Sequence, residues 1–428
     1  MKILITNIVT LNAGDAAILY AMIDVLRAAF AGNDIQFIVY DKHGNAPSRY
    51  YPELEFRKLL YLSREADNRG SDLLRRFSEI RFKLGLWSIK HNAPLLPHIF
   101  LTETERRDVL EYKTADLIVS SGGTYLVENY SLAARIFDYQ LSLNLEKPLV
   151  FFTQSLGPFS DPSNRKALLP IFSDSIAILV RDEQSVRNLE DLGVSNQHIH
   201  LAADAAFALS DLEALKAARL PVETSPQKLR VAISVREWRH FKSVEPAKGM
   251  KQYIHALRES SKYLVEKHNA EITYLSTCQG MPEYWTDDSR LAQTIVDGLP
   301  EATRRSVSVD ASFHQPAHLA HVLKSYDFVI ATRMHMAIIA LGVGKPVLPI
   351  AYEFKMQELF ERLGAGCWVQ DIETLSGNAL IQSLDRFIEE LPSIREPLFA
   401  AVEREYASAV ASGEIVKQAY EHWRKIKQ

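Results

Sequence analysis

The chain is poor in cysteine, proline and glycine. Its 428 residues include two Cys, 18 Pro and 18 Gly. Cys278 and Cys367 are far apart and lack CxxC spacing, which excludes a disulfide framework and a cysteine-built zinc or iron–sulfur site. The low Pro and Gly content excludes collagen-like and low-complexity chains. We therefore expect a globular protein of a reducing cytoplasm.

A general basic charge and a long apolar run are also missing. The 49 Lys and Arg are outnumbered by 53 Asp and Glu, so no nucleic-acid partner held through phosphate neutralisation is expected. No apolar stretch approaches the roughly 18 residues that span a membrane. Met1 to Asn7 lack the apolar core and cleavage site of a signal peptide. The sequence predicts a cytoplasmic protein or one on the inner membrane surface.

Several motifs of common enzyme classes are absent. We find no GxGxxG after a strand, no GxxxxGK[ST], no GxSxG and no HExxH. The acidic pair Asp287-Asp288 lacks DxD spacing and is typical of a solvated loop or a helix cap. We expect no metal site.

Buried-strand runs alternate with helical patterns along most of the chain, which indicates α/β architecture with parallel sheets. The first unit combines an apolar run from Ile3 to Val9 with a helical pattern from Ile18 to Ala29. The other predicted strands cover residues 35–40, 116–120, 148–153, 176–180, 198–202, 230–235, 271–276, 306–309, 328–331 and 346–350. Further helices are predicted over 183–192, 249–268 and 317–324.

A polar segment over residues 210–228, with Pro221 and Pro226, indicates a domain boundary. We predict an N-terminal domain over 1–215 and a C-terminal domain over 229–395. A terminal helix over 396–428 is expected to pack back on the N-terminal domain. Two doubly wound, Rossmann-like domains of this kind face a cleft, where ligands bind outside the carboxyl ends of the strands.

The C-terminal domain places basic residues after three predicted strands. Arg333 and His335 lie between the strand ending at Ala331 and a helix that stops at Gly342. Free amides and the helix dipole favour an anion there, and the guanidinium fork suits phosphate or carboxylate. Arg236 and Lys355 follow two further strands. Together these residues predict a site for a small polyanion, although ion pairs and a structural His would also account for them.

The N-terminal domain carries permissive backbone, amides, hydroxyls, a carboxylate and an aromatic ring after its strands. Such sets bind sugars, although glycines that only close turns are an alternative. The candidate acceptor residues are Asn12, Gly14, Gly122, Gly123, Tyr125 and Gln154.

These motifs, in this order, resemble those of the polysaccharide pyruvyltransferases. The matching pieces are Asn12-Ala13-Gly14-Asp15, Gly122-Gly123, Gln154-Ser155-Leu156-Gly157-Pro158, Val180-Arg181-Asp182-Glu183, Asp204-Ala205-Ala206-Phe207, Ser234-Val235-Arg236, Thr332-Arg333-Met334-His335 and the stretch from Lys345-Pro346 to Lys355. Thr277-Cys278-Gln279 departs from the family pattern, in which a His or an acidic residue is more usual.

The resemblance implies a GT-B-like fold and transfer of the enolpyruvyl unit of phosphoenolpyruvate onto a hexose of a cell-surface or exopolysaccharide precursor. The product would be a cyclic pyruvate ketal, and phosphate would be released. By motif match, Arg236, Arg333 and Lys355 would bind the donor and His335 would be the acid. We assign Asp15 as the base from its position alone. Phosphoenolpyruvate is a co-substrate in this scheme, and no cofactor is expected.

Two other functions stay open. One is a sugar-nucleotide-dependent glycosyltransferase or epimerase of the same architecture. The other is a non-catalytic subunit of a polysaccharide-assembly complex. The sequence leaves the oligomeric state and the acceptor sugar undetermined.

A basic amphipathic segment over residues 72–91 is not used by any of these functions. Leu73, Phe77, Ile80, Leu84 and Trp87 recur at helical spacing among several Lys and Arg. The segment is expected either to pack as an insertion on the N-terminal sheet or to lie on an anionic membrane, which would suit a lipid-linked acceptor.

Overall fold

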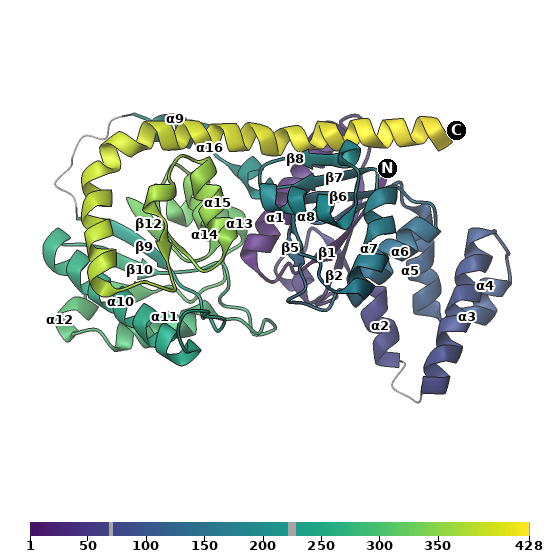
Figure 1. The fold of residues 1–428 in the computed structure, drawn as a ribbon, viewed down its shortest axis with the longest axis horizontal. Helices are drawn as coiled ribbons and strands as arrows, with labels where there is room; N and C mark the ends of the chain where they lie inside the picture. Colours follow the sequence, from purple (N-terminus) through teal and green to yellow (C-terminus); the bar gives the residue numbers. More distant parts are fainter. Residues whose placement is uncertain (68–71, 221–227, 428) are drawn as a thin grey trace. The chain divides into compact units, whose positions relative to one another are not determined.

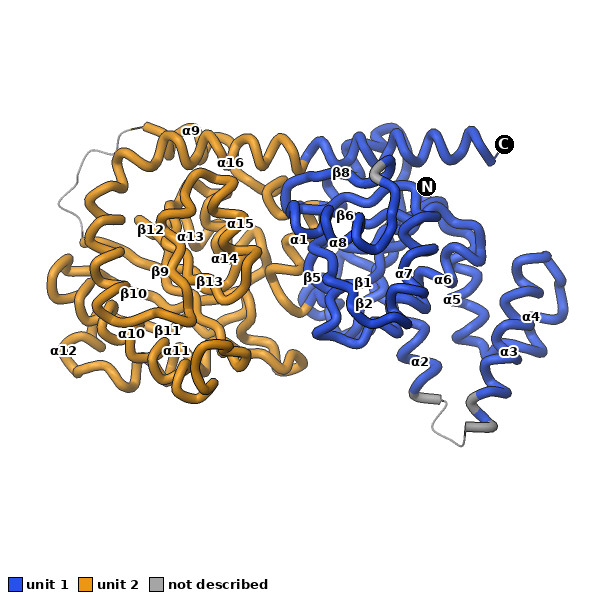
Figure 2. The backbone as a smooth tube through the Cα atoms, viewed as in Figure 1, with its two compact units in different colours: residues 1–10, 22–205, 410–428 blue, residues 11–21, 206–409 orange. Residues whose placement is uncertain are grey.

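The computed structural model describes residues 1–67, 72–220 and 228–427. Its contacts divide the chain into two compact units (Figure 2). Unit 1 comprises Met1–Thr10, Met22–Ala205 and Val410–Gln428, and unit 2 comprises Leu11–Ala21 and Ala206–Ala409. Each is an α/β unit built on a parallel sheet (Figure 1).

Unit 1 holds, in its described residues, an eight-stranded sheet in the order β3-β2-β1-β4-β6-β7-β8, with β5 paired to β6. The strands are β1 Lys2–Ile8, β2 Gln36–Asp41, β3 Glu55–Lys58, β4 Leu117–Ser120, β5 Gly123–Leu126, β6 Leu149–Leu156, β7 Ala177–Val180 and β8 Ile199–Leu201. Its helices are the part of α1 Ala13–Ala29 from Met22 onward, then α2 Leu60–Asp67, α3 Asp72–Lys90, α4 Leu96–Phe100, α5 Glu103–Thr114, α6 Ala133–Asn144, α7 Pro162–Asp174 and α8 Glu183–Leu192. The central strands are buried on both faces, as expected for a parallel sheet between helices.

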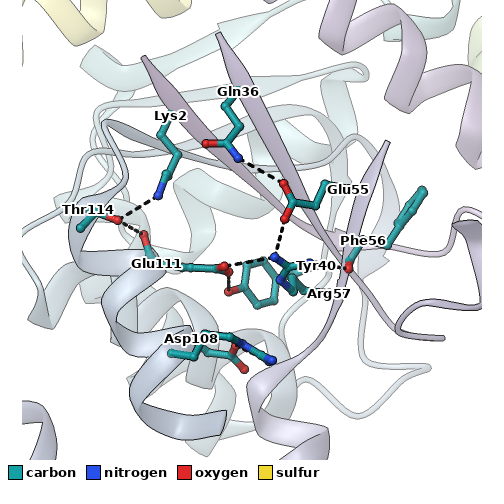
Figure 3. A network of polar contacts seen from close by, with 10 residues as sticks. Lys2, Gln36, Tyr40, Glu55, Phe56, Arg57, Asp108, Glu111 and Thr114 are labelled. Atoms are coloured by element: carbon teal, nitrogen blue, oxygen red, sulfur yellow. Dashed lines mark hydrogen bonds and ion pairs between the residues drawn. The ribbon is translucent and has the colours of Figure 1, made fainter. Parts of the chain in front are cut away.

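A polar network fixes the edge of this sheet to α5 (Figure 3). Tyr40 on β2 donates a hydrogen bond to Glu111 on α5 (2.7 Å), and Arg57 on β3 contacts the other oxygen of the same carboxylate (3.4 Å). Lys2 on β1 donates to Thr114 at the end of α5 (3.1 Å). One helix therefore binds side chains from three adjacent strands, which fixes the short strand β3 that the sequence pattern did not predict.

Unit 2 holds, in its described residues, a six-stranded parallel sheet in the order β11-β10-β9-β12-β13-β14. The strands are β9 Arg230–Ser234, β10 Glu271–Tyr274, β11 Val307–Val309, β12 Phe328–Ala331, β13 Val347–Ala351 and β14 Gln370–Asp371. The helices are α9 Leu212–Ala218, α10 Pro246–His268, α11 Asp288–Asp297, α12 Glu301–Arg304, α13 Pro316–Leu323, α14 Met334–Gly342, α15 Phe354–Arg362 and α16 Gly377–Lys427. Short 3₁₀ turns cover Ala46–Arg49, Asn196–His198, Ala205–Leu209 and Gly366–Trp368.

The boundaries of the two units differ from the predicted ones. Leu11–Ala21, which includes the first turns of α1, belongs to unit 2. The segment expected to be a linker contains α9, and its residues 221–227 lie outside the described residues. The terminal helix begins at Gly377, about twenty residues before the predicted start, and continues through Pro392 and Pro397. Its residues from Val410 onward belong to unit 1.

Candidate active site

Three neighbouring strands of unit 2, β9, β12 and β13, bring the candidate donor residues to one edge of the sheet. The order β10-β9-β12-β13 places the carboxyl ends of these strands side by side, because all of them are parallel. Arg236 follows β9, Arg333 and His335 follow β12, and Lys355 follows β13. The predicted convergence of Arg236, Arg333 and Lys355 on neighbouring strand ends is therefore present in the fold.

Arg333 binds a carboxylate of its own chain. Its Nε and Nη2 donate to the two oxygens of Asp288 at 2.8 and 2.6 Å. Asp288 also accepts a hydrogen bond from the Ser276 hydroxyl (2.5 Å). Burial disfavours the charge of Arg333, but Asp288 overcomes this effect, and the pKa of the arginine is raised. Asp287 caps α11 as predicted, whereas Asp288 is the buried partner of Arg333 and not a solvated residue.

Lys355 is also ion-paired, since its Nζ lies 2.6 Å from Glu353. Burial alone would raise the pKa of Glu353, but the combined effect of Lys355 and Arg236 outweighs burial. The net shift of the pKa is downward, and this carboxylate stays ionised. Two of the three expected donor-binding cations are therefore neutralised by acids within unit 2.

Arg236 has different surroundings. Its guanidinium donates to the Tyr352 hydroxyl and lies 4.2 Å from the centre of the Tyr352 ring and 5.4 Å from that of Trp238. Among the described residues, no carboxylate lies within ion-pair distance of Arg236. The two rings hold the guanidinium in a fixed orientation while its charge remains available to an anion.

His335 occupies the first turn of α14, and the first turn of α1 lies directly against it. The N-cap residue of α14, Arg333, makes no side-chain capping bond. A Cβ added to Gly14 would lie 2.7 Å from the Cβ and 2.8 Å from the Nδ1 of His335. Only glycine permits this approach, which places Asp15 in the neighbourhood of the histidine. The structure thus brings the two candidate catalytic residues, His335 and Asp15, into the same unit.

The placement of Gly14 and Asn12 differs from their expected place in an N-terminal acceptor domain, because both belong to unit 2. The side chain of Asn12 accepts a hydrogen bond from the Gly14 amide (2.9 Å) and its carbonyl from that of Ala16 (2.8 Å), so Asn12 caps α1.

The segment that departs from the family pattern lies within this cluster. The Thr277 carbonyl accepts a hydrogen bond from the Ala13 amide (3.0 Å), and the Cys278 carbonyl accepts one from the Asp288 amide (2.7 Å). Burial raises the pKa of Cys278 to about 12, which favours the protonated thiol at neutral pH. Burial, Cys278 and Asp15 likewise raise the pKa of Tyr284. Sequence reasoning missed Tyr284, Tyr352 and Asp288, because nothing local in the sequence marks their proximity to Arg333.

The predicted acceptor residues of unit 1 lie at the carboxyl ends of β4 and β6 and on β5. Gly123 has a φ of +120°, and its backbone approaches the ring of Tyr125, which is 9% exposed. Gln154 is fully buried, and its Nε2 donates to the Ser120 and Ser121 carbonyls at 3.2 and 2.9 Å. Its amide nitrogen is therefore used by the fold, which leaves it poorly suited to hydrogen-bond a sugar.

A residue that the sequence did not single out joins this cluster. Arg135 on α6 donates to the Asn7 side chain (2.5 Å), and its guanidinium lies 5.7 Å from the centre of the Tyr125 ring. Arg135 is a better candidate sugar ligand of unit 1 than Gln154, because it is half-buried and makes no ion pair with a described carboxylate.

The described residues hold neither a metal-binding cluster nor a membrane-spanning helix. No group of three or more His, Cys, Asp and Glu side chains is arranged to hold a metal ion. No helix in that part of the chain is long and apolar enough to cross a membrane.

Comparisons with known proteins agree on one family and one fold. A family model described as polysaccharide pyruvyl transferase matches residues 12–353. The amylovoran biosynthesis protein AmsJ of Erwinia amylovora is 25% identical over 413 residues, which cover 95% of this chain and 96% of AmsJ.

The similar solved structures have the GT-B fold, and at their low identity they show the fold alone. They include HepE from Anabaena in complex with UDP, with a TM-score of 0.55, 13% identity and coverage of 99% of this chain and 100% of HepE. MnaA from S. aureus, also solved with UDP, has a TM-score of 0.58, 14% identity and coverage of 100% and 98%. The expected GT-B-like α/β fold is therefore confirmed.

Proposed function

Since this chain belongs to the polysaccharide pyruvyl transferase family, we propose that it moves the enolpyruvyl unit of phosphoenolpyruvate onto a hexose of an exopolysaccharide precursor, forming a cyclic ketal. The similarity to AmsJ supports a role in exopolysaccharide biosynthesis. The observation that carries the proposal is the convergence of Arg236, the start of α14 with His335, and Asp15 within unit 2. A small polyanion suits such a place better than a neutral ligand does.

In the proposed donor site, Arg236 binds one anionic group of phosphoenolpyruvate. The start of α14 receives the other, since its N-cap residue, Arg333, makes no side-chain capping bond. Arg333 has a different role from the predicted one: fixed and neutralised by Asp288, it orients the turn that precedes α14. Lys355 lies in the first turn of α15, where it is paired with Glu353, and is a further basic residue at this edge of the sheet.

The proposed reaction begins when C3 of phosphoenolpyruvate takes a proton and C2 becomes electrophilic. A sugar hydroxyl adds to C2 and loses its proton to Asp15. The C2–O bond to phosphate then breaks, and His335 supplies the proton to the leaving phosphate. A second hydroxyl of the sugar adds to C2 and loses its proton, which closes the ketal. The two protons lost by the sugar hydroxyls equal the two taken up by C3 and by the leaving phosphate. One phosphate is released for each ketal, and the steps use no resident cofactor.

The proposal is tested by incubating the full chain with isotope-labelled phosphoenolpyruvate and an exopolysaccharide precursor, free or lipid-linked. We expect release of phosphate that depends on the saccharide, and label in the saccharide product. A thermal-shift comparison of phosphoenolpyruvate with UDP-sugars separates the alternative function, because a ligand that binds the folded state raises its Tm. Stabilisation by a UDP-sugar alone would favour a sugar-nucleotide enzyme. Ligand binding without turnover would favour an assembly subunit.

A further inference from the structure

Helix α3 exposes a row of large apolar side chains. Phe77, Ile80, Leu84 and Trp87 are 69%, 58%, 44% and 55% exposed. Their spacing of three, four and three residues puts them on one face of the helix. The opposite face carries Phe82, which is buried in the core of unit 1. The apolar stripe that the sequence predicts therefore faces outward in its described part, and it does not pack on the sheet. Leu73 lies among the residues whose side chains are not described.

Helix α4, which packs beside α3, also exposes large apolar side chains. Leu95 and Ile99, at and within α4, are 73% and 67% exposed. Helix α3 packs on α4 and α5, at the edge of unit 1 (Figure 1). The helices meet closely, because a Cβ on Gly85 would lie 2.3 Å from the side chain of Leu101. Helix α3 is therefore held in place by α4 and α5 while its apolar side chains remain exposed.

Positive charge lies along one side of the stripe. Arg76 and Lys83 are exposed and lie seven residues apart, so they form a second row beside the apolar one. Lys90 continues this row, but its Nζ is paired with Glu146 (2.9 Å). Glu79 is the one acid that α3 exposes among its described side chains, and it lies on the same side, three residues from Arg76 and four from Lys83. Arg81 is engaged elsewhere, since it donates to the Phe100 carbonyl (2.6 Å) and to Glu105 (2.8 Å).

We propose that the exposed face of α3, together with Leu95 and Ile99, docks unit 1 onto an anionic lipid membrane. The apolar row would enter the boundary between headgroups and acyl chains, and the basic row would contact lipid phosphates. Trp87 belongs to the residue type that concentrates at this boundary. The charges select a membrane over a second copy of the chain, because a symmetric pairing of two such faces would bring two basic rows together. The inference does not depend on the chemistry proposed for unit 2.

The test is co-sedimentation of the full chain with vesicles of phosphatidylcholine alone and with added phosphatidylglycerol. We expect binding to the anionic vesicles that weakens several-fold at high salt, because salt screens surface charge. The double variant Phe77→Ser with Trp87→Ser should abolish binding, and Arg76→Glu with Lys83→Glu should do the same. All four side chains are exposed, so folding should be unaffected. The matched control is Leu110→Ser with Leu169→Ser, which removes exposed apolar side chains from α5 and α7.

Each outcome decides the proposal. Loss of vesicle binding in the α3 variants, with binding retained in the control, supports the membrane surface. If no binding to anionic vesicles is seen, the proposal is overturned. If light scattering also shows a dimer that the α3 variants dissociate, the occupant is a second copy of the chain. None of these variants touches unit 2, so donor binding and turnover report separately on the proposed function.

Discussion

The guanidinium of Arg333 donates two hydrogen bonds to the carboxylate of Asp288, which lies forty-five residues earlier in the chain. The pair is almost completely buried. Arg333 follows β12, whereas Asp288 begins α11 after the long loop from β10. The pair therefore fixes the end of one strand to the loop that follows another. A fixed guanidinium has lost its conformational freedom before any donor arrives, which is what preorganisation of a site requires.

Asp288→Asn should destabilise the protein strongly, because it leaves the Arg333 charge buried without its counter-charge. Breaking a buried pair in this way costs about 3–5 kcal/mol in the free energy of unfolding, measured by denaturant titration. Asp287→Asn is the matched control and should change little, since Asn replaces Asp well at an N-cap. Equal effects of the two substitutions would show that the pair adds nothing to stability. Arg333→Lys should also lose stability, because a point charge cannot reproduce the fork.

His335→Ala should lower turnover by roughly 10²–10⁴-fold, the range of general acid–base catalysis. The Tm and its rise with phosphoenolpyruvate should change little, because the α14 amides and Arg236 remain. The measurement is single-turnover phosphate release. The control, His321→Ala, removes an exposed histidine of α13. Near wild-type turnover of His335→Ala would remove the histidine from the mechanism.

Arg236→Lys should weaken donor binding with little effect on stability. The planar guanidinium lies over Tyr352 and Trp238, and an ammonium cannot both stack there and present a second donor. Loss of one charge-assisted hydrogen bond costs about 1.5–3 kcal/mol, which raises Kd by about tenfold or more. Calorimetry with phosphoenolpyruvate measures it, and Arg239→Lys, at an exposed ion pair with Glu237, is the control. An unchanged Kd would contradict the assignment of Arg236.

Gly14→Ala should reduce activity more than stability. Alanine in place of glycine favours a helix by about 1 kcal/mol, and this gain offsets part of the cost of the new contact with His335. The new methyl group would overlap the Cβ and the ring of His335, so the whole histidine must shift. We expect kcat to fall while the Tm changes by a few degrees at most, compared by steady-state kinetics and thermal unfolding. A variant as active as wild type would show that the position of His335 is not held by this contact.

Asp138 should make the stability of unit 1 depend on pH. Burial raises the pKa of Asp138 from 3.8 to about 7, although a hydrogen bond from Thr6 (2.9 Å) opposes the shift. The folded state then holds the proton more tightly than the unfolded state does, so stability is lost as pH rises from about 4 to 7. The loss is at most roughly 4 kcal/mol.

The matched variant is Asp138→Asn, which keeps an acceptor for Thr6 and stays neutral. Its free energy of unfolding should equal that of wild type near pH 4 and exceed it at pH 8, measured by denaturant titration across that range. Parallel pH profiles for the two proteins would show that Asp138 is not the group responsible.

Much of the fold follows from local pattern, because buried parallel strands and amphipathic helices leave periodic signals. The predicted helix over 183–192 coincides with α8 and ends at Gly193, whose φ is +97°. Strands β3, β5 and β14 escaped prediction because they are only four, four and two residues long, too short to leave a periodic signal. The early start of α16 was hidden by Pro392 and Pro397, which usually end a helix.

The candidate site was predictable only in outline. Strand ends located Arg236, Arg333 and His335, since parallel topology collects them at one edge. The neutralisation of Arg333 by Asp288 depends on the path of the loop after β10, and no spacing rule specifies such a path. The same holds for the contact of Gly14 with His335, which joins residues more than three hundred positions apart.

Neither compact unit corresponds to one continuous stretch of the gene. Unit 2 takes Leu11–Ala21 from the beginning of the chain, and unit 1 takes Val410–Gln428 from its end. An expression fragment cut at residue 206 would consequently lack Gly14 and Asp15 while retaining His335. Dissecting donor from acceptor binding in this molecule therefore calls for a circularly permuted or grafted chain, and a simple truncation series would be misleading.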